Sequence, residues 1–260
     1  MKLKDRVAIV TGGGTGIGRA TAVTFASEGA RVVVAARTLS RLEEVVEEIQ
    51  SGGGQAEAIQ TDISDEKQVQ RMVAQTLNDY GQIDILVNNS AVANGALVAD
   101  MVLDNWNEVL AVNLTGTMLC SREVLKSMIP RKSGSIVNIS SVAGIYGVPG
   151  LGAYSASKWG VIGFTQTLAI EVGEYNIRVN SISPAATRTD RFVGPQKARA
   201  DALGVPFEEV MSEILPRYSL KRIADPSEIA AAALFLASDD ASAITGHNLV
   251  ASCGFHAIHP

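Results

Sequence analysis

The sequence predicts an α/β fold in which a parallel, doubly wound sheet is covered by helices on both faces. Short runs rich in β-branched residues alternate with longer amphipathic stretches along the 260-residue chain. The short runs are apolar throughout, as expected of strands that helices bury from both sides. No linker or internal repeat divides the chain, so we expect one domain, residues 1–260, with a seven-stranded sheet.

Each expected element follows from its local pattern. The strands are expected at residues 6–11, 30–37, 55–63, 83–89, 134–140, 177–183 and 247–252. The helices are expected at residues 18–29, 39–50, 65–81, 104–129 and 154–173. Ser64 is the expected cap of the third helix, and Gly81 follows its end. Pro130 is expected to stop the fourth helix.

The composition excludes several classes of protein. The net charge is −5 and the basic residues are scattered, which argues against a nucleic-acid partner. The longest apolar run, residues 229–237, is about half of a membrane span, and the apolar stretch near the N-terminus is too short for a signal peptide. Cys120 and Cys253 are too few for a disulfide framework. We therefore expect a cytoplasmic protein with no membrane or nucleic-acid partner.

A glycine-rich loop, TGGGTGIG at residues 11–18, joins the first expected strand to the first helix. Glycines here permit a tight turn and a close approach of the backbone to a pyrophosphate at the helix N-terminus. The spacing, Gly12-x-x-x-Gly16-x-Gly18, differs from the usual G-x-G-x-x-G, and a glycine loop can also be a plain turn. Its place after a strong first strand favours a dinucleotide site.

The end of the second strand indicates which dinucleotide would bind. An NAD site usually has an acidic residue about 20 residues after the glycines, which bonds the ribose hydroxyls. Here Ala36, Arg37 and Thr38 stand at that place. Arg37 could pair with a 2′-phosphate through charge-assisted hydrogen bonds, so we predict NADP, with NAD as the alternative. The other interpretation of Arg37 is a surface arginine that begins a helix.

Tyr154 and Lys158 are four residues apart in an expected helix, so both side chains lie on one face. A nearby cation lowers the pKa of a phenol, because it stabilises the phenolate. The pair is therefore a candidate acid/base catalyst, although such pairs are also common on exposed helices.

Residues 185–221 interrupt the alternation and are expected to form a substrate-binding lid. Regular apolar residues in this proline-rich segment argue against a disordered insertion and suggest a partly hydrophobic substrate. Four basic residues could meet an anionic substrate group: Arg188, Arg191, Lys197 and Arg199. Nearby acidic residues nearly balance them, so a solvated surface explains these charges equally well.

Several motifs stand in order along the chain: TGGGTGIG, TDIS after the third strand, NNSA after the fourth, AVNLTG, NISSVAG and YSASK. Together they resemble the short-chain dehydrogenase/reductase family over nearly the whole chain, in the branch with 3-oxoacyl-carrier-protein reductases and secondary-alcohol dehydrogenases. The resemblance implies a Rossmann-type fold and a homotetramer or homodimer. The stretches 115–125 and 156–172 could supply the interface, but such apolar stripes would also be ordinary core.

The resemblance also implies roles for individual residues. Its catalytic set is Asn113, Ser141, Tyr154 and Lys158, with Ser141 thirteen residues before Tyr154. Tyr154 would exchange the proton, Ser141 would donate to the same oxygen, and Lys158 would lower the Tyr154 pKa and hold the nicotinamide ribose. Asn113 would anchor a water, and Asn88 would support the central strands. The implied cofactor contacts are Gly12, Thr15, Gly16, Ile17, Gly18, Arg37, Asp62, Ile63, Asn89, Ala91, Tyr154, Lys158, Pro184, Thr187 and Thr189.

Some residues leave alternatives open or depart from the family pattern. Residues 111–117 are poor helix formers, which predicts a local kink, and Asn113 there could instead be a buried structural residue. The departures, interpreted as substrate tailoring, are Ala91 and Ala185 in place of glycines, Thr187 in place of isoleucine, and Ser252-Cys253 in place of Asp-Gly. No tight ligand spacing supports a metal site among His247, His256, His259 and Cys253, so a polar tail is expected.

The residues and the resemblance together predict an oxidoreductase that transfers a hydride between NADP(H) and a ketone or secondary alcohol, with Tyr154 as acid/base. One alternative keeps this chemistry with NAD. Another is a non-catalytic dinucleotide-binding regulator, which would be expected to lack Tyr154, Lys158 or Ser141. A lyase- or dehalogenase-like relative is a further alternative, but it would fill the glycine loop with larger side chains.

Overall fold

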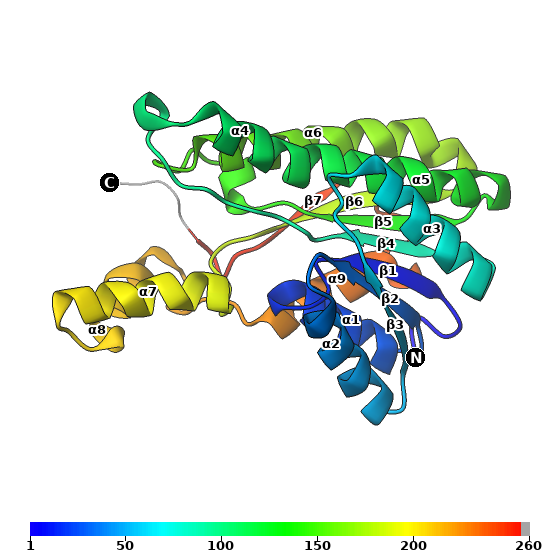
Figure 1. Ribbon diagram of the computed structural model, residues 1–260, viewed down its shortest axis with the longest axis horizontal. Coiled ribbons are helices and arrows are strands. Elements are labelled where there is room, and N and C mark those ends of the chain that lie inside the picture. The colour runs from blue at the N-terminus through cyan, green and yellow to red at the C-terminus, as the bar shows by residue number, and fades with distance from the viewer. Residues whose placement is uncertain (256–260) are drawn as a thin grey trace.

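The computed structural model describes residues 1–255 and contains one seven-stranded sheet in the order β3-β2-β1-β4-β5-β6-β7 (Figure 1). Every neighbouring pair of strands in this sheet is parallel. The strands are β1 (Val7–Thr11), β2 (Arg31–Ala36), β3 (Gln55–Gln60), β4 (Ile85–Asn88), β5 (Gly134–Ile139), β6 (Ile177–Pro184) and β7 (Asn248–Ala251). The predicted doubly wound α/β fold is confirmed.

Helices cover both faces of the sheet (Figure 1). One face packs against α1 (Gly16–Ser27), α2 (Leu39–Ser51) and α9 (Pro226–Ala237). The other face packs against α3 (Glu66–Tyr80), α5 (Gly116–Arg131) and α6 (Gly152–Val172), with α4 (Leu103–Leu110) beside α6. The central strand β1 is buried along its whole length, which explains its uninterrupted apolar sequence.

The N-terminal end of α3 differs from the expectation, while its C-terminal end agrees with it. Asp65, not Ser64, caps α3, because its carboxylate accepts hydrogen bonds from the backbone N–H of Lys67 and Gln68 at 2.9 and 3.1 Å. The Ser64 hydroxyl instead donates to Asp62. Gly81 does follow the helix, in the left-handed conformation at φ 76°.

Pro130 does not stop α5, which continues to Arg131 and ends at Lys132 in the left-handed conformation. A proline in the last turn removes only one helical hydrogen bond, so the helix tolerates it there. The expected helix 104–129 is also not continuous. A π-helical turn at Ala111–Thr115 separates α4 from α5, at the place where the kink was expected.

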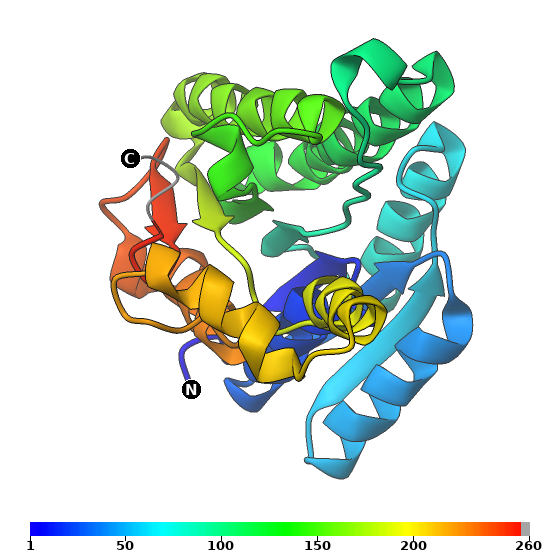
Figure 2. The same cartoon turned by 90° about the vertical axis from the view of Figure 1, so that its left-hand side faces the viewer.

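The segment 185–221 forms a helix pair, α7 (Asp190–Leu203) and α8 (Phe207–Ile214), that lies to one side of the sheet (Figures 1 and 2). Its regular apolar residues form a small separate core around Met211, Tyr218 and Ile223, against which Phe192 and Phe207 pack. The segment is therefore ordered by its own apolar contacts. Whether it acts as a lid stays a prediction.

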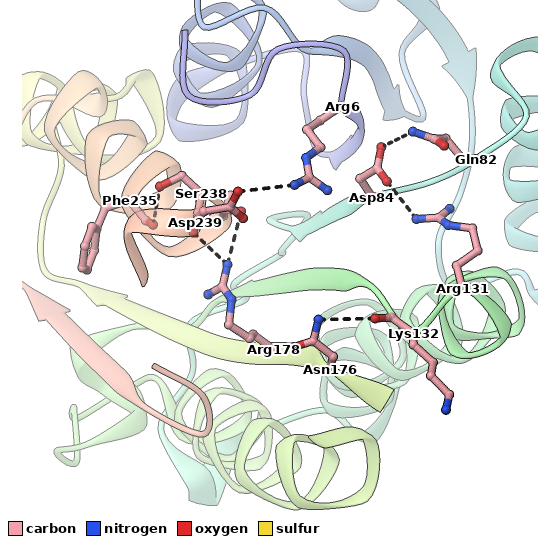
Figure 3. Close-up of polar contacts among 11 residues, drawn as sticks. Arg6, Gln82, Asp84, Arg131, Lys132, Asn176, Arg178, Phe235, Ser238 and Asp239 are labelled. Carbon is pink, nitrogen blue, oxygen red and sulfur yellow. Dashed lines mark hydrogen bonds and ion pairs between the residues drawn. The ribbon is translucent and has the colours of Figure 1, made fainter. Parts of the chain in front are cut away.

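Charged side chains tie elements together at the amino ends of the strands (Figure 3). Asp84 is 5% exposed and accepts hydrogen bonds from Val7 N, Gln82 Nε2 and Arg131 Nη2, each at 2.8 Å. Arg178 donates to three carbonyls at the C-terminal end of α9, where a cation also complements the helix dipole. Among residues 1–255, no helix is both long and apolar enough to cross a membrane.

Candidate active site

The candidate site lies at the carboxyl ends of β1, β4, β5 and β6, where a cleft of about 620 Å³ opens. Ligand sites of open parallel sheets form at this edge, where the strand order reverses. The cleft brings together most of the residues expected from the sequence, namely Gly12, Thr15, Gly16, Ile17, Asn89, Ala91, Ser141, Tyr154, Lys158, Pro184, Thr187 and Thr189. Gly18 and Asn113 do not line it.

The glycine loop follows β1 and has a backbone that side chains would obstruct. Gly12 and Gly16 have positive φ angles, 64° and 53°. A Cβ on Gly18 would overlap the carbonyl oxygen of Gly12. Asn89 holds the loop in place, because its Nδ2 donates to the carbonyls of Thr11 and Gly12 at 3.0 and 3.1 Å. This bare backbone at the start of α1 fits a dinucleotide pyrophosphate.

A second cavity of about 470 Å³ continues from the glycine loop to the end of β2. Arg37, Asp62 and Ile63 line it, as the sequence led us to expect for an adenosine site. Arg41 lines both cavities and was not foreseen. Its signal in the sequence is its place four residues after Arg37, at the start of α2. Arg37 and Arg41 are two of the three arginines that line this cavity, and their guanidinium groups near the end of β2 fit an additional phosphate.

Ser141 and Tyr154 meet at the other end of the cleft. Ser141 directly follows Ser140 at the end of β5, and its hydroxyl accepts a hydrogen bond from Ala143 N at 3.1 Å. Tyr154 stands in the first turn of α6 and receives a hydrogen bond from the Ser141 side chain. The Ser140 hydroxyl donates to the Lys158 carbonyl at 2.9 Å, which fixes α6 against the end of β5. Two hydroxyls therefore converge where a substrate oxygen could bind.

Lys158 is buried beside this pair. Its Nζ donates to the carbonyl of Ile139 at 2.7 Å and lies 5.7 Å from the centre of the Tyr154 ring. Burial lowers the pKa of Lys158 to about 7, and the charge of Arg191 acts in the same direction. Burial raises the pKa of Tyr154, while Arg191 and the hydrogen bond from Ser141 oppose that rise. The expected lowering of the Tyr154 pKa is thus not found. The rise in pKa caused by desolvation of the phenol is larger than the lowering caused by the charge of Arg191 and the hydrogen bond from Ser141.

Asn113 is fully buried in the π-helical turn. Its side chain accepts from Val92 N at 2.8 Å and donates to Val92 O at 2.9 Å and Ser157 Oγ at 3.0 Å. Its own carbonyl accepts from the Thr117 hydroxyl at 2.9 Å. These bonds tie the segment after β4 to α6, which agrees with the structural alternative.

A second asparagine joins the central strands. Asn88 donates from its Nδ2 to Asn138 Oδ1 at 2.8 Å and to Ser121 Oγ at 3.1 Å, which links β4 to β5 and α5. This position agrees with the supporting role that the resemblance implies.

Three of the departures from the family pattern, Ala91, Ala185 and Thr187, line the cleft. The carbonyl of Ala91 accepts a hydrogen bond from Arg191 at 3.1 Å, and Ala185 packs in the small core of the helix pair. Cys253 has a positive φ of 51°, at a place where the family pattern has a glycine. His247 donates its backbone N–H to Asn180, while His256 and His259 lie outside the described residues. The described part of the chain holds no cluster of ligands suited to a metal ion.

Hydride transfer to or from a carbon–oxygen bond requires a dinucleotide cradle and a proton donor at one cleft, and this edge of the sheet offers both. The fold and the site therefore define a nucleotide-dependent oxidoreductase. The family model for short chain dehydrogenases matches residues 6–199, and the chain belongs to that family. It is accordingly an enzyme that acts on CH–OH and C=O groups, in a family that binds NAD(P).

Named relatives agree with this assignment. The chain is 39% identical to the 3-oxoacyl-[acyl-carrier-protein] reductase FabG of Thermotoga maritima, over 95% of this chain and 96% of that protein. The crystal structure of levodione reductase superimposes with a TM-score of 0.92 at 33% identity, covering 97% and 98% of the two chains. A single-residue variant of actinorhodin polyketide ketoreductase, crystallised with NADPH, reaches 0.90 at 35% identity, covering 96% of each chain.

Proposed function

We propose that the protein is an NADP(H)-dependent oxidoreductase that interconverts a ketone and a secondary alcohol. One observation carries the proposal: the hydroxyls of Ser141 and Tyr154 converge beside buried Lys158, in the cleft that the glycine loop also lines. A hydroxyl and a phenol directed at one oxygen polarise a carbonyl through hydrogen bonds. A non-catalytic regulator would not need these convergent polar groups.

Each residue then has a defined task during ketone reduction. The nicotinamide coenzyme, when bound, supplies the hydride to the carbonyl carbon. Tyr154 gives its proton to the carbonyl oxygen, and Ser141 donates a second hydrogen bond to that oxygen. The phenol of Tyr154 is protonated at neutral pH, as a proton donor requires, and Arg191 and the hydrogen bond from Ser141 oppose the rise in its pKa that burial causes. In alcohol oxidation the same oxygen of Tyr154 accepts the proton.

Other residues hold the coenzyme and support the site in this proposal. Residues of the glycine loop and Asn89 surround the pyrophosphate, while Lys158 contacts the nicotinamide ribose. Thr187 and Thr189, at the start of the helix pair, bind the nicotinamide end with Pro184. Asp62 and Ile63 contact the adenine. Asn113 positions α6 through Ser157, rather than acting on the substrate.

Arg37 and Arg41 support NADP as the coenzyme. No carboxylate stands at the end of β2 to bond the ribose hydroxyls or repel a 2′-phosphate, and both guanidinium groups line the cavity there. The polyketide ketoreductase whose structure contains NADPH agrees with this choice. NAD remains the alternative coenzyme.

Titration of the purified protein with NADPH and NADH, read by fluorescence, tests the coenzyme. We expect NADPH to bind more tightly, and Arg37→Asp to weaken NADPH binding by about 10- to 100-fold, because it removes charge-assisted hydrogen bonds. Arg71→Asp, on the exposed face of α3, is the control and should change neither dissociation constant. Tighter binding of NADH would replace NADP by NAD in the proposal, and binding of neither would overturn it.

We also propose a homodimer or homotetramer in the cytoplasm. Large apolar side chains are exposed on α6, α9 and β7, including Trp159 at 54%, Ile170 at 84% and Val250 at 48%. Burial of these side chains between copies of the chain would explain their exposure. Light scattering that finds only a monomer would contradict the assembly.

A further inference from the structure

Four of the six basic residues of the segment 185–221 were expected to meet an anionic substrate group, and they differ in their partners. Arg188 forms an ion pair with Asp225 at 3.0 Å, and Arg199 forms one with Glu213 at 2.6 Å. Arg191 makes no ion pair with a carboxylate anywhere in residues 1–255, and it donates instead to the carbonyl of Ala91 at 3.1 Å. Lys197 does not line the cleft. Among these four residues, Arg191 is the one that lines the cleft and has no carboxylate partner within residues 1–255.

Arg191 lies at the reacting end of the cleft. Its Cζ is 5.8 Å from the centre of the Tyr154 ring, and its charge acts on the pKa values of both Tyr154 and Lys158. It lines both cavities, and its side chain is exposed to solvent. A group that enters from solvent and reaches the Tyr154 hydroxyl therefore passes beside this guanidinium.

The charges around the substrate end favour an anion. The larger cavity is lined by three cations, Arg41, Lys158 and Arg191, and by one carboxylate, Asp190. Arg41 belongs to the end of the cleft near the glycine loop and β2, where the coenzyme phosphates would account for it. Lys158 and Arg191 stand together near Tyr154, and an anion bound beside them would favour the charged forms of both groups.

The position of Arg191 in its helix points the same way. It is the second residue of α7, whose N-terminus carries a partial positive charge that disfavours a cation. Helix stability therefore does not account for an arginine at this place. A role toward a ligand in the cleft does.

We propose that Arg191 binds a carboxylate of the substrate, so that this enzyme acts on oxo acids and the corresponding hydroxy acids. The inference rests on the proposed function, since it assumes that the carbonyl is reduced at Tyr154. A guanidinium offers two parallel N–H donors that match a carboxylate, and the bond to Ala91 holds the side chain over the cleft. Leu151, Ala186 and Phe192 line the same cavity and leave room for an apolar remainder of the substrate.

Matched pairs of substrates test the inference. The probes are short 2-, 3- and 4-oxo carboxylates and their methyl esters, each assayed with the preferred coenzyme on the wild type, Arg191→Met and Arg199→Met. We expect the wild type to prefer an acid over its ester. Arg191→Met should lose about 10- to 100-fold in kcat/KM for the acid, mainly through KM, because a charged hydrogen bond is removed. Its kcat/KM for the ester should fall much less, so that the preference for the acid over the ester is lost.

Arg199→Met removes the same charge from the same helix, but from an ion pair outside the cleft, so the acid preference should persist. Equal turnover of acid and ester by the wild type would overturn the inference and leave the proposed function intact. An equal loss for acid and ester in Arg191→Met, or a loss confined to NADPH binding, would also overturn it, since Arg191 would then hold the cleft or the coenzyme.

Absence of turnover with every probe would count against the proposed function. In that case calorimetry tests the inference separately. The oxo acids are titrated into the wild type and into Arg191→Met, and their dissociation constants are compared in the absence of turnover. Binding that is weakened about 10-fold or more by Arg191→Met supports the carboxylate site, and equal or absent binding overturns it.

Discussion

The two ends of the sheet use similar charged residues for different purposes. At the amino ends, Asp84 is buried among Val7, Gln82 and Arg131, and its contacts with Val7 and Arg131 join it to β1 and α5. Figure 3 shows Gln82 and Arg131 beside it. At the carboxyl ends, Lys158 and Arg191 each donate a hydrogen bond to a backbone carbonyl, and both line the cleft. A carboxylate shared by several donors contributes to stability, whereas a cation bound only to a carbonyl keeps its charge available for a ligand.

This contrast predicts that substitutions at the two ends separate activity from stability. Changes at the carboxyl ends should reduce turnover or binding with little effect on unfolding. Changes at the amino ends should lower the free energy of unfolding without altering the chemistry of the folded enzyme.

The largest effect is expected for Tyr154→Phe. The variant keeps the ring but loses the hydroxyl that gives the proton, so kcat should fall by about 10²- to 10⁴-fold. Initial rates with a ketone and NADPH measure the loss, and NADPH titration by fluorescence is the control for an intact cleft. Turnover at the wild-type rate would remove Tyr154 from the mechanism.

Asp84→Ala should mainly affect stability. The substitution leaves Arg131 and Val7 N without their shared partner, and breaking a buried pair costs about 3–5 kcal/mol. Urea unfolding measures the change, and kcat of the remaining folded protein should equal that of the wild type. A reduced kcat at unchanged stability would contradict the separation of the two ends.

The smallest effect concerns Lys158 and pH. Its pKa is about 7 in the folded protein, against 10.5 for an ordinary lysine, so the unfolded chain binds more protons between these values. The contribution of Lys158 to the free energy of unfolding is therefore greatest at high pH, and it falls as the pH drops toward about 7. Between pH 7 and 8 the wild type should gain up to about 1.4 kcal/mol relative to Lys158→Met.

Urea unfolding of both proteins at a series of pH values measures this difference. Lys158→Met serves as the reference because it has no titrating group at the site. Parallel stability curves for the two proteins would show that Lys158 keeps an ordinary pKa in the folded state.

The sequence alone determined the sheet, its two helical layers and most of the cleft. Apolar runs and helical periodicity are local signals, and a parallel sheet brings the ends of its strands to one edge, so Gly12, Ser141 and Tyr154 had to meet. The motifs around Tyr154 and Lys158 also led to the family, which the comparison with known proteins then showed.

Only the tertiary structure decided which polar groups are paired and which are buried. Asp65, and not Ser64, caps α3, and Asn113 is buried with hydrogen bonds to Val92 and Ser157. The tertiary structure also buried Tyr154 enough to raise its pKa, and it left Arg191 as the basic residue of its segment that faces the cleft without a carboxylate partner. These outcomes depend on neighbours far apart in the chain, because solvation and charge pairing are set by packing between elements.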